Sequence, residues 1–259
     1  MTGEAVVRQT DGAVATLSIN RPERRNAINS EVTRALSDSL ARAEADESIR
    51  TVVLTGAGDK AFCAGGDLSA MNSEGAVAQH FTRAEIGELF TQMRKSRLPI
   101  VARVNGHALA GGFGLMLACD LVVASAGAEM GTPEIDLGLW PFMITTVIQK
   151  DLPRKLALEL MLTGRRMTAS EAQRWGFVNR VVEASELDNA VEELTGSLVS
   201  KSPLITALGK QSFYRAEDMD FDEALAYLSG MLTVGLQSED TAEGVTAFLQ
   251  KRTPEWKGR

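Results

Sequence analysis

The spacing of hydrophobic and polar positions changes from that of strands to that of a helix within the first 46 residues. Residues 5–20 alternate in the manner of strands on both sides of Asp11 and Gly12, which predicts a β-hairpin that turns at these two residues. Residues 30–46 instead carry apolar side chains at helical spacing, with Ser30 as the predicted N-cap. The chain therefore begins with a predicted hairpin followed by an amphipathic helix.

The segments that follow repeat the order of strand and helix. An apolar run at 51–58 predicts a buried strand, and residues 75–96 predict an amphipathic helix. A further strand is predicted from 99, a helix opened by glycines from 111, and another strand from 121. Because strands that alternate with helices favour parallel neighbours, this order predicts an α/β fold with mainly parallel strands.

From about residue 143 onward the pattern is largely helical, without an internal repeat or a low-complexity linker. We therefore divide the chain into an α/β core at 1–197 and a helical C-terminal region at 198–259. Long helical ends of this kind often pack on a neighbouring subunit, and we expect the same of this region.

Composition narrows the class of protein without identifying it. The 259 residues are 44% hydrophobic and 24% charged, and the net charge of −7 argues against a nucleic-acid partner. Two cysteines and two histidines suggest neither a disulfide framework nor a metal site. No apolar run reaches the roughly 18 residues of a membrane span, and no signal peptide is recognised at the N-terminus. These features predict a cytoplasmic protein without a membrane partner or a metal.

Two short segments leave the backbone almost bare where a strand is predicted to end. One is residues 64–66 within "AFCAGGDL", and the other is residues 110–112 at the start of a predicted helix. Glycine lets another molecule approach the main chain, and a helix N-terminus leaves N–H groups unpaired. Two such amides that converge would form an oxyanion hole. The alternative is that these glycines only permit tight turns and close packing.

A carboxylate follows in the segment "GTPEIDLGLWP" at 131–141. Glu134 comes directly after Pro133 and is flanked by apolar residues, so a partly apolar pocket would raise its pKa and suit it to acid–base catalysis. The alternative is a surface carboxylate that caps a turn. Asp136, two residues further on, is a candidate for either role.

Four motifs together resemble the enoyl-CoA hydratase/isomerase (crotonase) superfamily over nearly the whole chain. "INRPERRNAIN" is similar to the N-R-P-x-x-x-N-A segment of the family, and "AFCAGGDL" to its first oxyanion-hole and CoA-binding motif. "VNGHALAGGFGLMLACDLVVAS" resembles the second oxyanion-hole motif, and "GTPEIDLGLWP" the segment of the catalytic glutamate. The resemblance implies a spiral of ββα units with a C-terminal helical trimerisation region. It also implies a CoA thioester substrate, no other cofactor, and a homotrimer or dimer of trimers.

The resemblance also assigns roles to individual residues. The backbone N–H groups of Gly66 and Gly111 would hold the thioester oxygen, and Glu134 would carry the proton. The residues implied along the CoA are Arg24, Arg25, Ala27, Ala64, Gly65, Asp67, Leu68 and Lys251. Of these, Asp67 is expected to brace its loop, and Lys251 or its neighbour Arg252 to reach the CoA phosphates, including from a neighbouring subunit.

The chain departs from the hydratases of this family at one position. Those enzymes use two glutamates, and the first of them falls on Gly114, while Glu134 matches the second. One base is enough to move a proton between the α and γ carbons, so we expect double-bond isomerisation or slow hydration. Three acids remain candidates to replace the missing one: Asp136, Glu85 and Glu88. The alternatives are a non-catalytic CoA-thioester binder or another acyl-CoA reaction, such as hydrolysis or decarboxylation.

Overall fold

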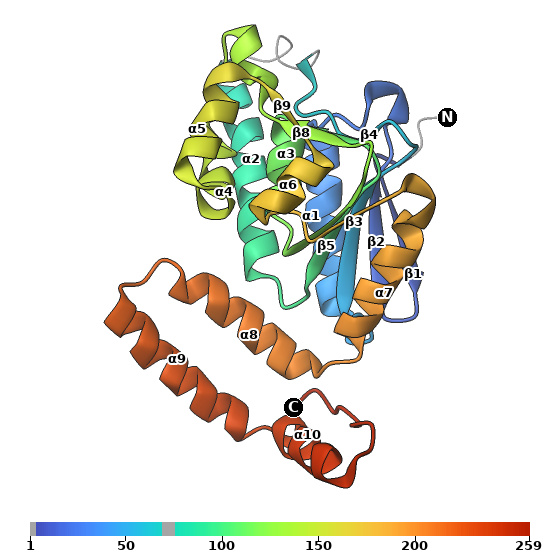
Figure 1. Cartoon of the computed structure of the whole chain (residues 1–259), viewed down its shortest axis with the longest axis vertical. Coiled ribbons are helices and arrows are strands. Elements are labelled where there is room, and N and C mark those ends of the chain that lie inside the picture. The colour runs from blue at the N-terminus through green and yellow to red at the C-terminus, as the bar shows by residue number, and fades with distance from the viewer. Residues whose placement is uncertain (1–3, 69–75) are drawn as a thin grey trace.

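The computed structural model of the chain describes residues 4–68 and 76–259, without the side chains of 76–79 and 81–83. Within these residues the strands form a sheet of six and a sheet of four (Figure 1). The larger sheet has the order β1 (Val6–Asp11), β2 (Val14–Ile19), β3 (Thr51–Gly56), β5 (Ile100–Val104), β7 (Leu121–Ser125) and β10 (Arg180–Val182). The smaller sheet has the order β4 (Ala61–Cys63), β6 (His107–Leu109), β8 (Glu129–Gly131) and β9 (Arg166–Thr168).

Helices separate successive pairs of strands. The chain places β3 in the larger sheet and β4 in the smaller one before α2 (Ala76–Lys95) returns it to β5. It then repeats this course through β6 and α3 (Gly111–Leu117) to β7 and β8. The neighbours β3, β5 and β7 are parallel, as are β4, β6 and β8. The predicted spiral of ββα units is therefore confirmed.

The predicted hairpin and the helix that follows it both form, but the turn and the helix N-cap each differ from the prediction by one residue. β1 and β2 pair antiparallel, but Asp11 still pairs with Val14, so the turn consists of Gly12 and Ala13. α1 (Ser30–Ala45) is capped by Asn29 rather than Ser30, because Asn29 has extended backbone and its side chain accepts a hydrogen bond from the amide of Val32. Ser30 is already helical and cannot serve as the cap.

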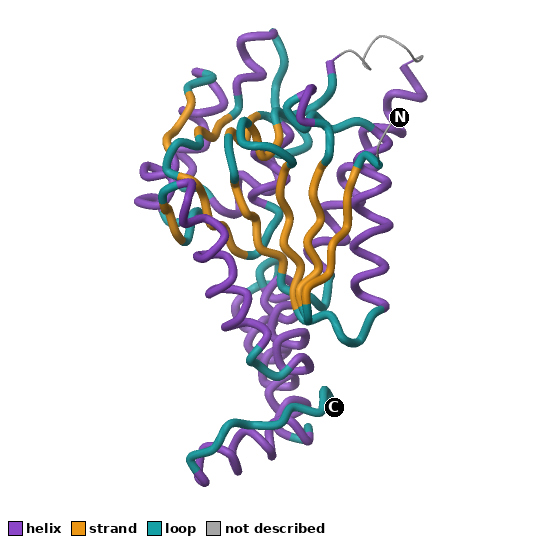
Figure 2. The backbone as a smooth tube through the Cα atoms, turned by 90° about the vertical axis from the view of Figure 1, so that its right-hand side faces the viewer, coloured by secondary structure: helices purple, strands orange, loops and turns teal. Residues whose placement is uncertain are grey.

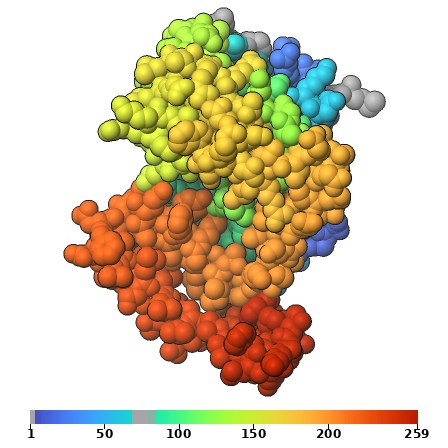
Figure 3. Space-filling model, viewed as in Figure 1, coloured from blue at the N-terminus to red at the C-terminus, as the bar shows by residue number. Residues whose placement is uncertain are grey.

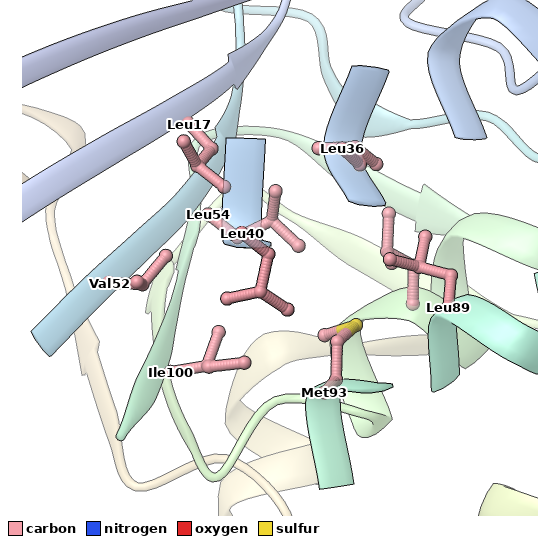
Figure 4. Close-up of a pocket in the computed structure, with 9 residues that line it drawn as sticks. Leu17, Leu36, Leu40, Val52, Leu54, Leu89, Met93 and Ile100 are labelled. Carbon is pink, nitrogen blue, oxygen red and sulfur yellow. The ribbon is translucent and has the colours of Figure 1, made fainter. Parts of the chain in front are cut away.

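The main core lies between the larger sheet and helices α1 and α2. A void of about 20 Å³ remains there, and Figure 4 shows apolar side chains surrounding it. Its lining is Leu17, Leu36, Leu40, Val52, Leu54, Leu89, Met93, Ile100 and Leu115. Because a water molecule would find no hydrogen-bonding partner among these side chains, the void is a packing defect rather than a ligand site.

The remaining helices cover the sheets and extend the chain beyond them. They are α4 (Thr145–Asp151), α5 (Arg154–Thr163), α6 (Ala169–Trp175), α7 (Leu187–Val199), α8 (Pro203–Ala216), α9 (Phe221–Leu236) and α10 (Glu239–Gln250). In Figures 1 and 2 the last three lie below the sheets. The predicted boundary between the α/β core and the C-terminal region, at 197/198, falls in the last turn of α7. This boundary stays a prediction. No helix in the described ranges has the length and apolar character needed to cross a membrane.

A lysine with a largely covered side chain ties the C-terminal helices to the core. Lys210 of α8 donates hydrogen bonds from Nζ to the carbonyl oxygens of Met93 and Leu98, at 3.0 and 2.8 Å. The same ammonium group lies 2.7 Å from the carboxylate of Asp120. α8 is therefore fixed against the end of α2, although α9 and α10 project away from the core (Figure 3).

Candidate active site

The three segments selected from the sequence follow three adjacent strands. Residues 64–66 follow β4, residues 110–112 follow β6, and residues 132–134 follow β8. These strands are neighbours in the smaller sheet and run parallel. Because the carboxyl ends of parallel strands share one edge of a sheet, the two glycine segments and Glu134 meet at the same edge.

The two glycine segments are in direct contact. A Cβ atom built on Gly65 would lie 2.6 Å from the Cβ of Ala110, so a larger residue cannot fit there. A Cβ built on Gly111 would lie 3.7 Å from the amide nitrogen of Gly66, which places the two amides beside each other. At Gly66 itself a Cβ would meet nothing within 4 Å. Close packing therefore explains Gly65, whereas Gly66 lies at an open surface.

The two amides are available to a ligand. Gly111 is the first residue of α3, and among the described residues neither its N–H nor that of Gly66 has a hydrogen-bond acceptor. Ala110 before it has φ +53° and ψ −130°, a conformation that costs an L-residue on the order of 1–3 kcal/mol. A hydrogen bond of 2.8 Å from its amide to the carbonyl of Gly131 holds it there. Two free amides side by side can stabilise a negatively charged oxygen.

Glu134 supplies a carboxylate at the same sheet edge. It lies in a short 3₁₀ helix, Pro133–Leu137, and its Oε2 atom is buried without a hydrogen-bond partner in the described structure. Burial raises the pKa of this carboxyl group, while a hydrogen bond from its own backbone amide opposes the shift. The side chain is thus partly desolvated and keeps one oxygen without a partner, unlike a surface carboxylate that caps a turn, and is suited to accept a proton.

Comparison with known proteins identifies the family of the chain. The family model for enoyl-CoA hydratase/isomerase matches residues 9–259. A short-chain-enoyl-CoA hydratase from Clostridium acetobutylicum is 36% identical over 248 residues, which cover 95% of each chain. A carnitinyl-CoA dehydratase from Proteus mirabilis is 37% identical over 255 residues, covering 96% of this chain and 97% of its own. The crystal structure of an enoyl-CoA hydratase from Mycobacterium smegmatis matches with a TM-score of 0.94 at 34% identity, covering 97% of this chain and 98% of that one. The chain belongs to the enoyl-CoA hydratase/isomerase family.

Three acids were candidates to replace a glutamate at position 114, and the structure places each of them differently from Glu134. Asp136 is exposed, and its carboxylate lies 3.0 Å from the position of a Cβ on Gly164, at the end of α5. Glu85 is held by Arg34 of α1, with an ion pair of 2.7 Å. Glu88 is exposed on α2. Compared with these three acids, Glu134 alone has a buried carboxylate oxygen at the edge where β4, β6 and β8 end.

The loop that carries Arg24 and Arg25 lies along the first glycine segment. The amide of Ala64 donates to the carbonyl of Arg25 at 3.1 Å, and the amide of Ile28 donates to that of Gly65 at 2.8 Å. Both arginine side chains are exposed, whereas Ala27 is buried. The structure thus brings together most of the residues that the family resemblance assigns to CoA, including the exposed Leu68 at the end of the same segment.

Two residues that hold this loop were not selected from the sequence. Arg21 pairs with Asp67 at 2.8 Å and also donates to the carbonyl of Ala27 at 2.8 Å, so Asp67 braces its loop as expected. Asn26 is 1% exposed and donates to the carbonyl oxygens of Ala57 and Ala61. Their position within "INRPERRNAIN" was the only signal, because nothing in the sequence identifies their distant partners.

Lys251 is the candidate that this chain does not bring to the site. It is the C-terminal cap of α10, has φ +55° and is exposed. α10 lies below the sheets in Figure 1, whereas β4 and β8 lie near the top. A contact between Lys251 and a CoA bound at Gly66 therefore requires a second copy of the chain, and stays a prediction.

Proposed function

We propose that this enzyme isomerises an enoyl-CoA thioester by moving a proton between its α and γ carbons. The observation that carries the proposal is the carboxylate of Glu134, whose Oε2 atom is buried without a hydrogen-bond partner among the described residues, in a chain that has glycine at position 114. Proton transfer along the acyl chain needs one base, whereas positioning and activating a water is the task that the family resemblance assigns to two glutamates.

The proposed reaction uses the groups already described. The thioester oxygen lies between the N–H groups of Gly66 and Gly111, which stabilise the charge that develops on it when the α or γ carbon is deprotonated. Glu134 takes that proton and returns it to the other carbon, so the double bond moves and no atom is gained or lost. A desolvated carboxylate with a raised pKa is a stronger base than an ordinary glutamate.

Hydration or dehydration is the second candidate. It is favoured by the names of two relatives, a short-chain-enoyl-CoA hydratase and a carnitinyl-CoA dehydratase. One carboxylate can activate a water, but a positioned acid–base group contributes about 10²–10⁴-fold to a rate, so the loss of its partner would make hydration slow.

Absorbance of the conjugated thioester distinguishes the two reactions. With a 3-enoyl-CoA substrate we expect the absorbance to rise, because isomerisation creates the conjugated 2-enoyl thioester. A fall with a 2-enoyl-CoA at a comparable rate would instead establish hydration. No change with either, despite measurable binding, would favour the binding-only alternative, and the product mass would reveal hydrolysis or decarboxylation.

We further propose that the CoA lies along the loop 21–28 and the segment 64–68. Arg24 and Arg25 would meet its pantetheine, and the backbone of Ala64 would lie near the adenine. The support for this proposal is the set of hydrogen bonds that joins the two segments, from Ala64 to Arg25 and from Ile28 to Gly65. The proposal includes no cofactor other than this CoA, and a cytoplasmic location stays a prediction.

The assembly that we propose is a homotrimer or a dimer of trimers. Its support is the number of large apolar side chains exposed on the last three helices, an arrangement that monomers rarely leave in contact with water. They include Phe213, Phe221, Leu225, Leu232, Leu236, Val245, Phe248 and Leu249. Light scattering should give a mass of three or six chains of 27.9 kDa, and a monomer at micromolar concentration would contradict the proposal.

A further inference from the structure

The space beside Gly114 is filled by a residue from another helix. A Cβ atom built on Gly114 would lie 2.1 Å from Cγ2 and 2.6 Å from Cβ of Ile144. The second of these atoms is attached directly to the backbone, so a different rotamer of Ile144 cannot make room. Any side chain at position 114 therefore requires the chain at the start of α4 to move.

Ile144 is part of an apolar wall. It is 3% exposed and is the N-cap residue of α4, which fixes its backbone. The Cζ atom of Phe90, on α2, lies 3.5 Å from the same Cβ position on Gly114. Gly114 is three residues after Gly111 on α3, and residues at this spacing share one face of a helix. The wall of Ile144 and Phe90 thus covers α3 at Gly114, on the face of the helix that Gly111 shares.

A cavity of about 610 Å³ with a mixed polar and apolar lining lies on the other side of this wall. Phe90 and Met143 belong to its lining, together with carboxylates of Asp120, Asp151 and Glu217. Burial and the nearby carboxylate of Glu217 raise the pKa of Asp151 to about 7. Gly66, Gly111 and Glu134 are not among the described residues that line this cavity. The wall therefore separates the glycine face of α3 from a cavity that has room for water and acids to supply protons.

We propose that Ile144 determines the reaction specificity of this enzyme by occupying the volume that a water-positioning carboxylate at residue 114 would need. Without a carboxylate at residue 114 to position a water, Glu134 returns its proton to carbon and no water adds. The inference rests on the proposed isomerase function. It goes beyond that function because it makes the glycine at 114 and the isoleucine at 144 a coupled pair, which cannot be exchanged one at a time.

Stability tests the steric part of this inference independently of activity. The set consists of Gly114→Ala, Ile144→Gly and the double variant in the full-length protein, with the thermal midpoint as the readout. Gly114→Ala should destabilise the wild type, because its Cβ meets Ile144, but should have little effect when residue 144 is glycine. Losses that simply add in the double variant would overturn the inference, because independent sites are additive.

Reaction products test the catalytic part. The double variant Gly114→Glu with Ile144→Gly should hydrate 2-enoyl-CoA about 10²-fold faster than the control pair Gly114→Ala with Ile144→Gly, which has the same backbone space but no carboxylate. Gly114→Glu alone should unfold or remain inactive in hydration. The inference is overturned if Gly114→Glu alone folds and hydrates as well as the double variant, or if the double variant folds and hydrates no faster than its control.

A single substitution keeps the test decisive if the glutamate variants do not fold. Ile144→Ala should open the wall to the cavity and raise the ratio of 3-hydroxyacyl-CoA to isomerised product, and an unchanged ratio would overturn the inference. If the wild type proves not to isomerise at all, the proposed function fails. The stability coupling, and hydration gained only by the paired glutamate variant, would still support the role of Ile144.

Discussion

Replacing Glu134 with glutamine should lower the rate of proton exchange at the α carbon of an acyl-CoA by about 10²–10⁴-fold, the contribution of a positioned acid–base group. Glutamine has nearly the same size, so the pocket keeps its shape, but its amide cannot accept the proton. Uptake of deuterium from solvent, followed by mass spectrometry of the acyl-CoA, measures this step directly and does not depend on which product the enzyme releases.

The matched control is Asp136→Asn, two residues further along the same segment. Asp136 is exposed and faces Gly164, so its neutralisation should leave the exchange rate near that of the wild type. The opposite pattern, with exchange lost in Asp136→Asn and retained in Glu134→Gln, would transfer the catalytic role to Asp136. Exchange retained in both variants would show that neither carboxylate carries the proton.

The pH dependence of wild-type activity should also show that Glu134 is the base. Glu134 acts as a base only when ionised, and burial raises its pKa above the ordinary value of 4.5. Activity should therefore be lost as the pH falls through this raised pKa, at a pH higher than that at which an exposed glutamate is protonated. A profile of kcat/KM that stays flat through this range would argue against Glu134 as the base.

Replacing Gly66 with proline should lower kcat by about 10²–10³-fold, the effect of removing one donor from an oxyanion hole. Proline lacks the N–H group that we assign to the thioester oxygen. The hydrogen bonds that hold this segment use the carbonyl of Gly65 and the amide of Asp67, both paired with Ile28, so they do not depend on the amide of Gly66.

Gly66→Ala provides the control, because it keeps the N–H group and its Cβ would meet nothing within 4 Å. It should fold and turn over like the wild type. A loss in kcat with little change in KM would locate the effect of proline in the transition state rather than in substrate binding. If the proline variant keeps both its thermal midpoint and its kcat, Gly66 is not a donor to the reacting oxygen.

The sequence predicted elements best where the physical signal is local. The buried run at 51–58 became β3, because six consecutive apolar or small residues suit a strand covered on both faces. The hairpin turn and the N-cap of α1 were each wrong by one residue. Several neighbouring residues there have suitable side chains, and the backbone conformation decides between them: Asn29 is extended and caps, whereas Ser30 is already helical.

The glycines show a second limit of sequence reasoning. For both glycine segments the sequence left two explanations open, an oxyanion hole or close packing. In the structure each explanation applies to different glycines. Gly65 and Gly112 are required by packing, since a Cβ on Gly112 would lie 2.1 Å from the carbonyl oxygen of Cys63. Gly66 has open space, and Gly111 presents its amide beside that of Gly66. Only the contact between the segments that follow β4 and β6 shows which glycines are required by packing and which present an amide to a ligand.

By itself the sequence indicated that two segments of bare backbone follow predicted strands, that a carboxylate lies in a third segment at Glu134, and that position 114 lacks an acid. These are properties of short segments, and parallel strands bring their ends together in any arrangement that pairs β4, β6 and β8. The tertiary structure alone decided that the Oε2 atom of Glu134 is buried without a partner among the described residues, that Arg21 braces Asp67, and that Ile144 occupies the space beside Gly114. Each of these depends on side chains far apart in the chain meeting within a few ångströms, and no local pattern specifies that distance.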